Sequence, residues 1–255
     1  MLLRAEDLGK RFGGVAALEA VDVAFERGAV HAVIGPNGAG KTTLLNVLSG
    51  VYRADSGKIF LDGEELTSRA PHEFAAAGVS RTFQNLQLFF NMTALENVMT
   101  GRWLHERCAL ASALLRLPAL ARAEHACREA AAALLDMVGL SRWADARADS
   151  LPYGALKRLE IARALAAEPR LLLLDEPAAG LNAAETREID ELIRRTAARG
   201  VAVVLVEHNM KLVMEVAQHV VVLDYGRKLA EGAPQVVSRD RRVIEAYLGA
   251  EACST

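Results

Sequence analysis

The sequence predicts an α/β fold in which a mostly parallel sheet with flanking helices is joined by an antiparallel β layer and interrupted by an inserted α-helical subdomain. The first observation is a strand-like apolar run, Val30–Ile34, that leads into a glycine-rich loop and then a helical run. The second is the leucine run Leu171–Leu174, which is typical of a central parallel strand covered on both faces. The third is a change of character over residues 71–167, where alanine, leucine, arginine and glutamate dominate and apolar residues recur at helical spacing.

The first part of the chain is expected to form the antiparallel β layer. Leu2–Leu8 and Val21–Phe25 show short apolar alternation, and the glycine-containing segment Arg11–Gly14 lies between them. A second hairpin-like patch follows at Gly57–Leu66, where Asp-Gly at 62–63 is a strong turn signal. These patterns predict strands that precede and follow the glycine-rich loop.

The last third of the chain is expected to complete the parallel sheet. Strand character returns at Val201–Val206, after a helical segment over Ala183–Arg199. A final pair of short strands is predicted at His219–Leu223 and Lys228–Ala230.

These segments divide the chain into a core and an insertion. We predict that residues 1–86 and 167–255 form the core with its antiparallel β subdomain, and that residues 87–166 form the α-helical subdomain. We find no internal repeat and no low-complexity linker between these parts.

The segment after Val30–Ile34 fits the G-x-x-x-x-G-K-[ST] pattern of a phosphate-binding loop. Its glycines let the backbone curl so that successive N–H groups point at phosphate oxygens, and the helix that follows adds its dipole. Lys41 can reach the β- and γ-phosphates, and the Thr42 hydroxyl can bind Mg²⁺. The core is therefore predicted to be that of a P-loop NTPase, with a nucleoside triphosphate and Mg²⁺ as its ligands. The predicted nucleotide-binding loop consists of Gly35, Pro36, Asn37, Gly38, Ala39, Gly40, Lys41, Thr42 and Thr43.

Two carboxylates end the leucine run. A buried strand that ends in Asp175 and Glu176 places both acids at its carboxyl edge, where open α/β sheets bind ligands. Asp175 is suited to hold Mg²⁺, directly or through water, and Glu176 is suited to deprotonate an attacking water molecule. The alternative is that the acidic pair only caps the turn at Pro177.

The composition excludes several other classes of protein. With 30 Lys and Arg against 32 Asp and Glu, the formal net charge is −2, so the chain has no general attraction to nucleic acid. The apolar stretch over 109–121 is interrupted by Arg116 and Pro118, so we expect no membrane span, and the charged first residues do not resemble a secretory signal. The cysteines at 108, 127 and 253 are dispersed, without metal-ligand spacing, and are interpreted as isolated thiols in a reducing compartment.

These motifs together resemble the ATP-binding subunits of ABC transporters, and the resemblance spans almost the whole chain. It implies that Phe12 stacks on adenine, and that Gln84 touches Mg²⁺ and links the core to the helical lobe. It also implies that His208, after the strand Val201–Val206, contacts the γ-phosphate. Glu176, His208 and Gln84 are therefore the predicted catalytic residues, and Thr42, Gln84 and Asp175 the predicted metal ligands, partly through water.

The signature segment of the family, usually Leu-Ser-Gly-Gly-Gln, corresponds here to Leu151, Pro152, Tyr153, Gly154 and Ala155. In the family this segment faces the nucleotide of the opposite subunit, so these residues are also predicted to contact nucleotide. Pro152 offers neither a hydroxyl nor an N–H, and Ala155 lacks the usual amide. Either the remaining N–H groups suffice in a homodimer, or the chain pairs with a related ATPase whose standard signature serves the site of Lys41 and Glu176. We favour the heterodimer.

Three further segments resemble the ATPases of branched-chain amino-acid importers, which typically use two different ATPase subunits. The segments are Glu176–Asn182, Glu207–Met214 and Val243–Gly249. The helical stretch Gly101–Arg128 resembles an extension found in that group, and we favour its interpretation as a solvated amphipathic hairpin. In the loop Glu176–Asn182, Asn182 stands where the family usually has an aspartate, which keeps a hydrogen-bonding side chain but removes the negative charge.

This resemblance implies a set of partners and a location. Transmembrane permease subunits are expected to contact the surface near Leu86–Phe90, and a solute-binding protein is expected to act indirectly. The chain is then a peripheral protein on the cytoplasmic face of the inner (plasma) membrane. Alternatives are an importer of urea, amides or another solute, an exporter ATPase, a non-hydrolysing nucleotide sensor, and a soluble ABC ATPase outside transport.

Overall fold

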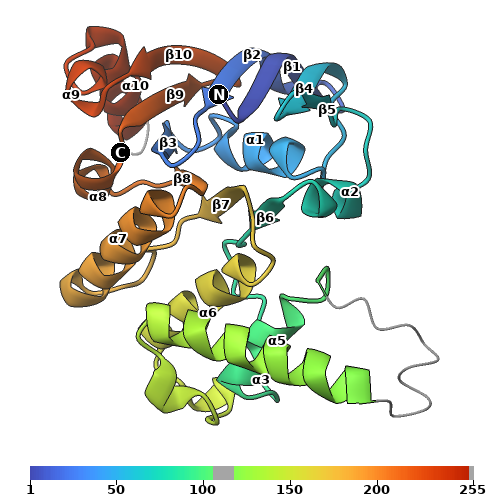
Figure 1. Ribbon diagram of the computed structural model, residues 1–255. Helices are drawn as coiled ribbons and strands as arrows, with labels where there is room; N and C mark the ends of the chain where they lie inside the picture. Colours follow the sequence, from blue (N-terminus) through green and yellow to red (C-terminus); the bar gives the residue numbers. More distant parts are fainter. Residues whose placement is uncertain (106–117, 253–255) are drawn as a thin grey trace. The chain divides into compact units, whose positions relative to one another are not determined.

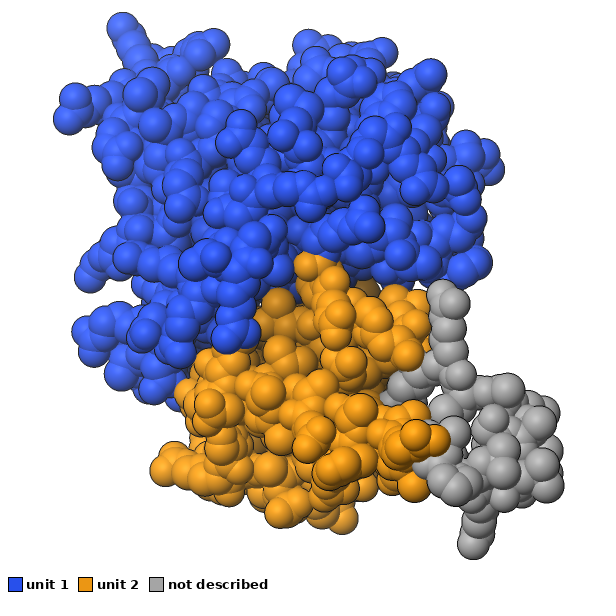
Figure 2. All heavy atoms as spheres, in the orientation of Figure 1, with its two compact units in different colours: residues 1–81, 170–255 blue, residues 82–169 orange. Residues whose placement is uncertain are grey.

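The computed structural model describes residues 1–105 and 118–252, and it divides the chain into two compact units (Figures 1 and 2). The core unit is Met1–Arg81 together with Arg170–Thr255, and the helical unit is Thr82–Pro169. Cys108, Cys253 and part of the segment Gly101–Arg128 lie outside the described residues, so the predictions for them are not addressed by the structure.

The larger sheet of the core unit has the strand order β10-β9-β3-β8-β7-β6 among the described residues (Figure 1). All neighbouring pairs from β9 to β6 run parallel, and β10 pairs antiparallel with β9. Every residue of β3, β7 and β8 is buried, as their continuous apolar runs predict for strands covered on both faces. The predicted mostly parallel α/β sheet is confirmed. The strands are β3 (Val30–Ile34), β6 (Val79–Arg81), β7 (Leu171–Asp175), β8 (Ala202–Val206), β9 (His219–Asp224) and β10 (Arg227–Gly232).

The smaller sheet is antiparallel, with the order β2-β1-β4-β5, and it is the predicted β layer. Its strands are β1 (Leu3–Phe12), β2 (Val15–Phe25), β4 (Ser56–Leu61) and β5 (Glu64–Glu65). The first two are longer than the alternation predicts and meet at a two-residue turn. Register shifts interrupt the pairing of β1 with β2 between Ala5 and Leu8 and again before Arg11. Each shift resets which side chains face the core, so the alternation breaks although the strand continues.

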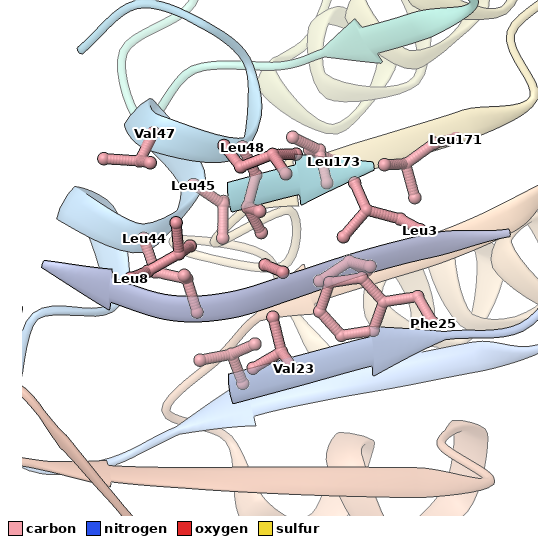
Figure 3. Close-up of a cluster of buried hydrophobic side chains, with 14 of the residues drawn as sticks. Leu3, Leu8, Val23, Phe25, Leu44, Leu45, Val47, Leu48, Leu171 and Leu173 are labelled. Atoms are coloured by element: carbon pink, nitrogen blue, oxygen red, sulfur yellow. The ribbon is translucent and has the colours of Figure 1, made fainter. Parts of the chain in front are cut away.

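The hydrophobic core of this unit lies around the helix α1 (Lys41–Leu48) that follows the glycine-rich loop (Figure 3). The buried apolar side chains of α1 pack with side chains of β1, β2 and β7, and each of these α1 side chains is at most 1% exposed. Burying one such leucine stabilises the fold by about 1.5–3 kcal/mol. The loop is therefore fixed to a rigid base through α1. The labelled members of the cluster are Leu3, Leu8, Val23, Phe25, Leu44, Leu45, Val47, Leu48, Leu171 and Leu173.

The other helices of the core unit begin at identifiable caps. Asn182 precedes α7 (Ala183–Ala198), and its Oδ1 accepts the N–H groups of Ala184 and Glu185 at 2.9 and 3.0 Å. Glu185 in turn accepts the N–H of Asn182 at 3.0 Å, which completes a capping box. The uncharged side chain of Asn182 thus has a structural use at the start of α7. The remaining helices are α2 (Pro71–Ala76), α8 (Met210–Val216), α9 (Pro234–Val237) and α10 (Arg241–Ala252).

In the helical unit, α3, α5 and α6 pack on one another. Asn97, which is fully buried, ties the start of α3 to the preceding loop by bonding the N–H and C=O of Phe89 and the C=O of Thr93. None of the helices within residues 1–105 and 118–252 is long and apolar enough to cross a membrane. The unit contains α3 (Ala94–Thr100), α5 (Pro118–Met137), α6 (Tyr153–Leu165) and the short 3-10 turns Ser141–Trp143 and Ala148–Ser150.

His31 is a buried histidine in the middle of β3, with an exposed fraction of 3%. Its Nε2 accepts the backbone N–H of Glu26 at 2.9 Å, so the folded chain holds the ring neutral. Burial, aided by the neighbouring His219, lowers the pKa of His31 from 6.5 to about 4. At a pH between 6.5 and about 4, His31 is therefore protonated in the unfolded chain but neutral in the folded chain.

We therefore expect His31 to make the fold acid-sensitive. Above pH 6.5 the protonation of His31 does not affect the free energy of unfolding. As the pH falls from 6.5 to about 4, protonation of His31 in the unfolded chain lowers the free energy of unfolding by about 3 kcal/mol. Urea unfolding at pH 7, 6, 5 and 4 measures this slope. The variant His31→Gln keeps an acceptor for Glu26 but cannot be charged, so its slope should be shallower. His72→Gln, at an exposed position, is the control and should keep the wild-type slope; equal slopes for all three proteins would contradict the prediction.

Candidate active site

The phosphate loop, residues 35–43, joins the end of β3 to α1 and has a backbone that only glycine allows at two positions. Gly35 has φ +149°, and a Cβ there would lie 2.1 Å from the carbonyl oxygen of Leu223. Gly40 has φ +100°, and a Cβ there would lie 2.5 Å from the carbonyl oxygen of Ala17. These glycines let the loop curl tightly against the rest of the core unit.

The start of α1 is suited to bind an anion. Gly40 is the N-cap, and no side chain caps the N–H groups of the first turn. Uncapped N–H groups at a helix start, together with the helix dipole, attract phosphate. Thr42 is exposed in this first turn, as a ligand-binding hydroxyl must be.

Lys41 directs its ammonium group back over the loop. Its Nζ donates to the carbonyl oxygens of Gly35 and Pro36 at 2.8 and 2.9 Å, and the residue is only 6% exposed. Burial lowers the pKa of Lys41, whereas the charges of Glu176 and Asp175 raise it. The structure therefore brings the loop lysine and the acidic pair into one electrostatic environment, as the sequence predicts. The phosphate loop with Lys41 is suited to bind a polyphosphate, because its N–H groups and its ammonium attract negative charge.

Asp175 ends β7 and is paired with an arginine that the sequence analysis does not single out. Its Oδ2 accepts a hydrogen bond from Nη2 of Arg81 at 3.0 Å, and the two side chains are 2% and 6% exposed. A lone arginine at the end of a short strand carries no motif, and only the parallel pairing of β6 with β7 reveals this contact. Within the described residues no group of three or more His, Cys, Asp or Glu forms a metal site. The donors Thr42 and Asp175 instead suit Mg²⁺, which typically uses one or two protein ligands with phosphates and water.

Glu176 and His208 lie within hydrogen-bond distance. The Nε2 of His208 is 2.7 Å from Oε1 of Glu176. Glu176 has φ +49°, an unusual conformation for a residue with a side chain, and its N–H donates to the carbonyl of Val206 at the end of β8. Strained backbone of this kind is concentrated at functional sites. The structure thus joins two predicted site residues that are 32 positions apart in the sequence.

Glu207 supports this pair, although the sequence analysis gave it no role of its own. Its Oε1 accepts the N–H of Ala178 at 2.9 Å, and its Oε2 accepts the N–H of His208 at 3.2 Å. Burial raises the pKa of Glu207, and these backbone N–H groups oppose that rise. Glu207 therefore connects the loop after Glu176 to the loop that carries His208.

Phe12 lies at the exposed end of β1, with 45% of its surface accessible. The ring of Tyr52 meets it edge-on, with 5.3 Å between centroids, and the ammonium of Lys10 lies 5.5 Å from its centroid. Asp55 holds that ammonium by an ion pair of 2.8 Å. An exposed, fixed aromatic ring is suited to stack on a base, and Tyr52 is an addition that the sequence analysis missed.

The predicted signature segment belongs to the helical unit, where it forms the start of α6. Pro152 is the N-cap, so neither a hydroxyl nor a side-chain acceptor is present there. Tyr153 is 46% exposed, with the ammonium of Lys157 located 5.9 Å from its ring centroid. Leu151, Gly154 and Ala155 are buried within the unit.

Gln84 and the segment that follows it also belong to the helical unit. Gln84 is exposed, as are Phe89 at 47% and Phe90 at 43%. Leu88 is only 8% exposed and belongs to the interior of the unit, so it is not available to a partner. The buried Glu160 of α6 accepts the N–H of Gln87 at 3.3 Å, which fixes this segment to the signature helix.

Comparison with known proteins places these features in a family. A family model described as ABC transporter matches residues 18–179, and one described as Branched-chain amino acid ATP-binding cassette transporter matches residues 227–253. The chain is 44% identical over 249 residues to the high-affinity branched-chain amino acid transport ATP-binding protein BraF of Pseudomonas aeruginosa, covering 97% of this chain and 98% of that protein. It is 41% identical to the protein LivG of the same description in Escherichia coli, with the same coverage.

Solved structures agree with this result. An ADP conformation of an ATP-binding cassette of an ABC transporter has a TM-score of 0.85 and 32% identity, covering 97% of this chain and 98% of that chain. A nucleotide-free cassette has a TM-score of 0.84 and the same identity, covering 96% and 98%. These comparisons confirm the predicted P-loop NTPase fold and the predicted nucleotide binding. The chain therefore belongs to the ABC transporter family and is an ATPase of the ATP-binding cassette type.

Proposed function

We propose that this chain hydrolyses ATP, with Mg²⁺, to drive the import of branched-chain amino acids. The observation that carries the proposal is that the phosphate loop and the hydrogen-bonded pair Glu176 and His208 follow the ends of the adjacent parallel strands β3, β7 and β8. The similarity to branched-chain amino acid transport proteins over 97% of the chain supports the choice of solute.

The site residues divide the reaction among them. The N–H groups of the loop and Lys41 bind the β- and γ-phosphates, and Phe12 stacks on adenine. Water attacks the γ-phosphorus, the bond to the bridging oxygen of ADP breaks, and Glu176 takes the proton of the water. The bond from His208 to Glu176 holds the carboxylate in place and lets the imidazole reach the γ-phosphate. Thr42, Asp175 and Gln84 would hold Mg²⁺, partly through water, and the metal would supply positive charge to offset that on the phosphates.

The proposed partner ATPase compensates for the altered signature. In a dimer of cassettes, the signature segment of one subunit completes the nucleotide site of the other subunit. Because Pro152 caps α6 without a hydroxyl, this chain contributes few donors to its partner. We therefore favour a heterodimer in which a standard signature serves the loop of this chain.

Restoring the missing hydroxyl should raise activity in the isolated chain. We expect Pro152→Ser to increase ATP turnover of the chain alone about 10-fold, because a serine hydroxyl at the start of α6 can donate to the γ-phosphate of a second copy. Steady-state phosphate release at high protein concentration measures this. Pro118→Ser, at the start of α5, is a matched control. Full turnover by the unmodified chain alone, unchanged by Pro152→Ser, would contradict the heterodimer.

The proposed docking surface for the permease lies after Gln84. The exposed rings of Phe89 and Phe90, beside the half-buried Leu86, form an apolar area suited to a short helix. The permease would hold the chain at the cytoplasmic face of the membrane as a peripheral subunit, and a solute-binding protein would act through the permease. We expect no nucleic-acid partner, because a net charge of −2 gives the chain no general attraction to nucleic acid.

Reconstitution tests the proposal. The chain is combined in proteoliposomes with its permease and second ATPase, and ATP hydrolysis is measured with and without the solute-binding protein loaded with leucine. Stimulation by the leucine-loaded protein is expected. Stimulation by a urea- or amide-loaded protein instead would replace the solute while leaving the ATPase function in place.

A further inference from the structure

Arg81 is a buried arginine at the end of β6, and it bonds three residues of the core unit. Its side chain is only 6% exposed. Its Nη1 donates to Oδ1 of Asn46 at 2.5 Å and to Oγ of Ser49 at 3.2 Å. Its Nη2 donates to Oδ2 of Asp175 at 3.0 Å.

These contacts connect the two parts of the phosphate site, the phosphate loop with α1 and the acidic pair at the end of β7. Asn46 lies in α1, which starts at the phosphate loop, and Ser49 caps the end of that helix. Asp175 ends β7, the strand that pairs with β6. Ser49 is itself fixed, because its hydroxyl donates to the carbonyl of Leu45 at 2.7 Å. The guanidinium therefore joins the helix of the phosphate loop to the carboxylate of the acidic pair.

We propose that Arg81 is a positioning residue that sets the orientation of Asp175 for the divalent cation and locks it to α1. This inference rests on the proposed function, in which Asp175 holds Mg²⁺. A carboxylate has about four acceptor positions on its two oxygens, so the bond from Arg81 fixes the group without exhausting its capacity for a metal or its water. Partners of this kind commonly change metal affinity 10–100-fold when they are removed.

The charge of Arg81 also makes cation binding depend on nucleotide. The ion pair of Arg81 with Asp175 is neutral as a unit, so the empty site offers a divalent cation little net attraction. Phosphate oxygens must supply the remaining charge, so the cation binds together with the nucleotide. The substitution of lysine keeps the charge but not the planar fork that reaches α1 and β7 at once.

The experiment measures the cation directly, with Mn²⁺ and the non-hydrolysable analogue adenylyl-imidodiphosphate. Electron paramagnetic resonance gives the affinity and the line shape of bound Mn²⁺ in the wild type and in Arg81→Lys. We expect Mn²⁺ to bind about 10-fold more weakly to Arg81→Lys, with an altered line shape. Binding of the analogue in excess EDTA should change less than 2-fold, because Arg81 contacts the metal carboxylate and not the phosphate loop itself.

Two further proteins keep the test decisive. Arg53→Lys changes an exposed arginine bonded to Ser68 and should bind Mn²⁺ as the wild type does. Arg81→Gln removes both the planar fork and the positive charge beside Asp175. The lost charge favours cation binding whereas the lost fork frees the carboxylate, so the expected result for this variant is an altered Mn²⁺ line shape. If Arg81→Gln does not fold, the lysine variant alone decides, provided that its thermal unfolding midpoint stays within a few degrees of the wild type.

The outcomes separate this inference from the proposed function. Equal Mn²⁺ affinity and line shape in the wild type and in Arg81→Lys would overturn the positioning role while leaving the ATPase function in place. Failure of the wild type to bind Mn²⁺ with the analogue would overturn the proposed metal site, and the inference with it.

Discussion

Replacing Glu176 with glutamine is expected to lower ATP turnover about 1,000-fold while leaving ATP binding nearly unchanged. Glutamine has almost the same shape, and its amide can still bond to His208, so the geometry at the ends of β7 and β8 is kept. It cannot accept a proton from water, so the reaction loses its general base. The loss should fall on kcat, since the ground-state contacts of the nucleotide are proposed to come from the loop.

Phosphate release and equilibrium binding of a fluorescent ATP analogue measure the two effects separately. Glu191→Gln is a matched control, because that carboxylate lies on the exposed face of α7 in an ion pair with Arg195, and the change should leave both quantities unchanged. Turnover of Glu176→Gln within a few-fold of the wild type would remove Glu176 from the role of base. A parallel loss of binding would instead point to a disturbed fold around the strained backbone at this residue.

Replacing Lys41 with alanine is expected to weaken ATP binding about 100-fold and to abolish turnover. A charged hydrogen bond to phosphate contributes about 1.5–3 kcal/mol, and Lys41 is proposed to bind both the β- and the γ-phosphate. The ammonium also bonds the carbonyls of Gly35 and Pro36, so its loss relaxes the loop as well. Titration with the fluorescent analogue measures affinity, and circular dichroism checks the fold.

The control for this variant is Lys58→Ala, a lysine in β4 whose side chain is 60% exposed. It should bind ATP as the wild type does. A Lys41→Ala protein that binds ATP within 3-fold of the wild type would contradict the assignment of the loop.

The parts of the site that could be predicted from the sequence are those whose residues are adjacent in the chain. The phosphate loop is a local pattern in which strand, glycines, lysine and helix follow one another, and the structure has that order. The acidic pair was equally visible, because a buried leucine run fixes where a strand ends. The positions of Phe12, Gln84 and the signature segment came from the family resemblance, since a single aromatic or amide residue carries no pattern by itself.

The contacts that the sequence could not reveal are those made across the sheet. Arg81 meets Asp175 only because β6 and β7 pair in parallel, and the two residues are 94 positions apart. The bond of His208 to Glu176 depends in the same way on the neighbouring ends of β7 and β8. Leu88 belongs to the segment Leu86–Phe90, whose apolar side chains fit either a partner surface or the core. It is buried, and the sequence does not show this because hydrophobicity alone cannot distinguish an exposed anchor from a core residue.

The most direct test of the whole account is the uptake of labelled leucine at low external concentration by the native cell, with and without this chain. We expect uptake to be lost without the chain, to be restored by the intact chain, and not to be restored by the Lys41→Ala form. Unchanged uptake in the absence of the chain would contradict its role in importing branched-chain amino acids.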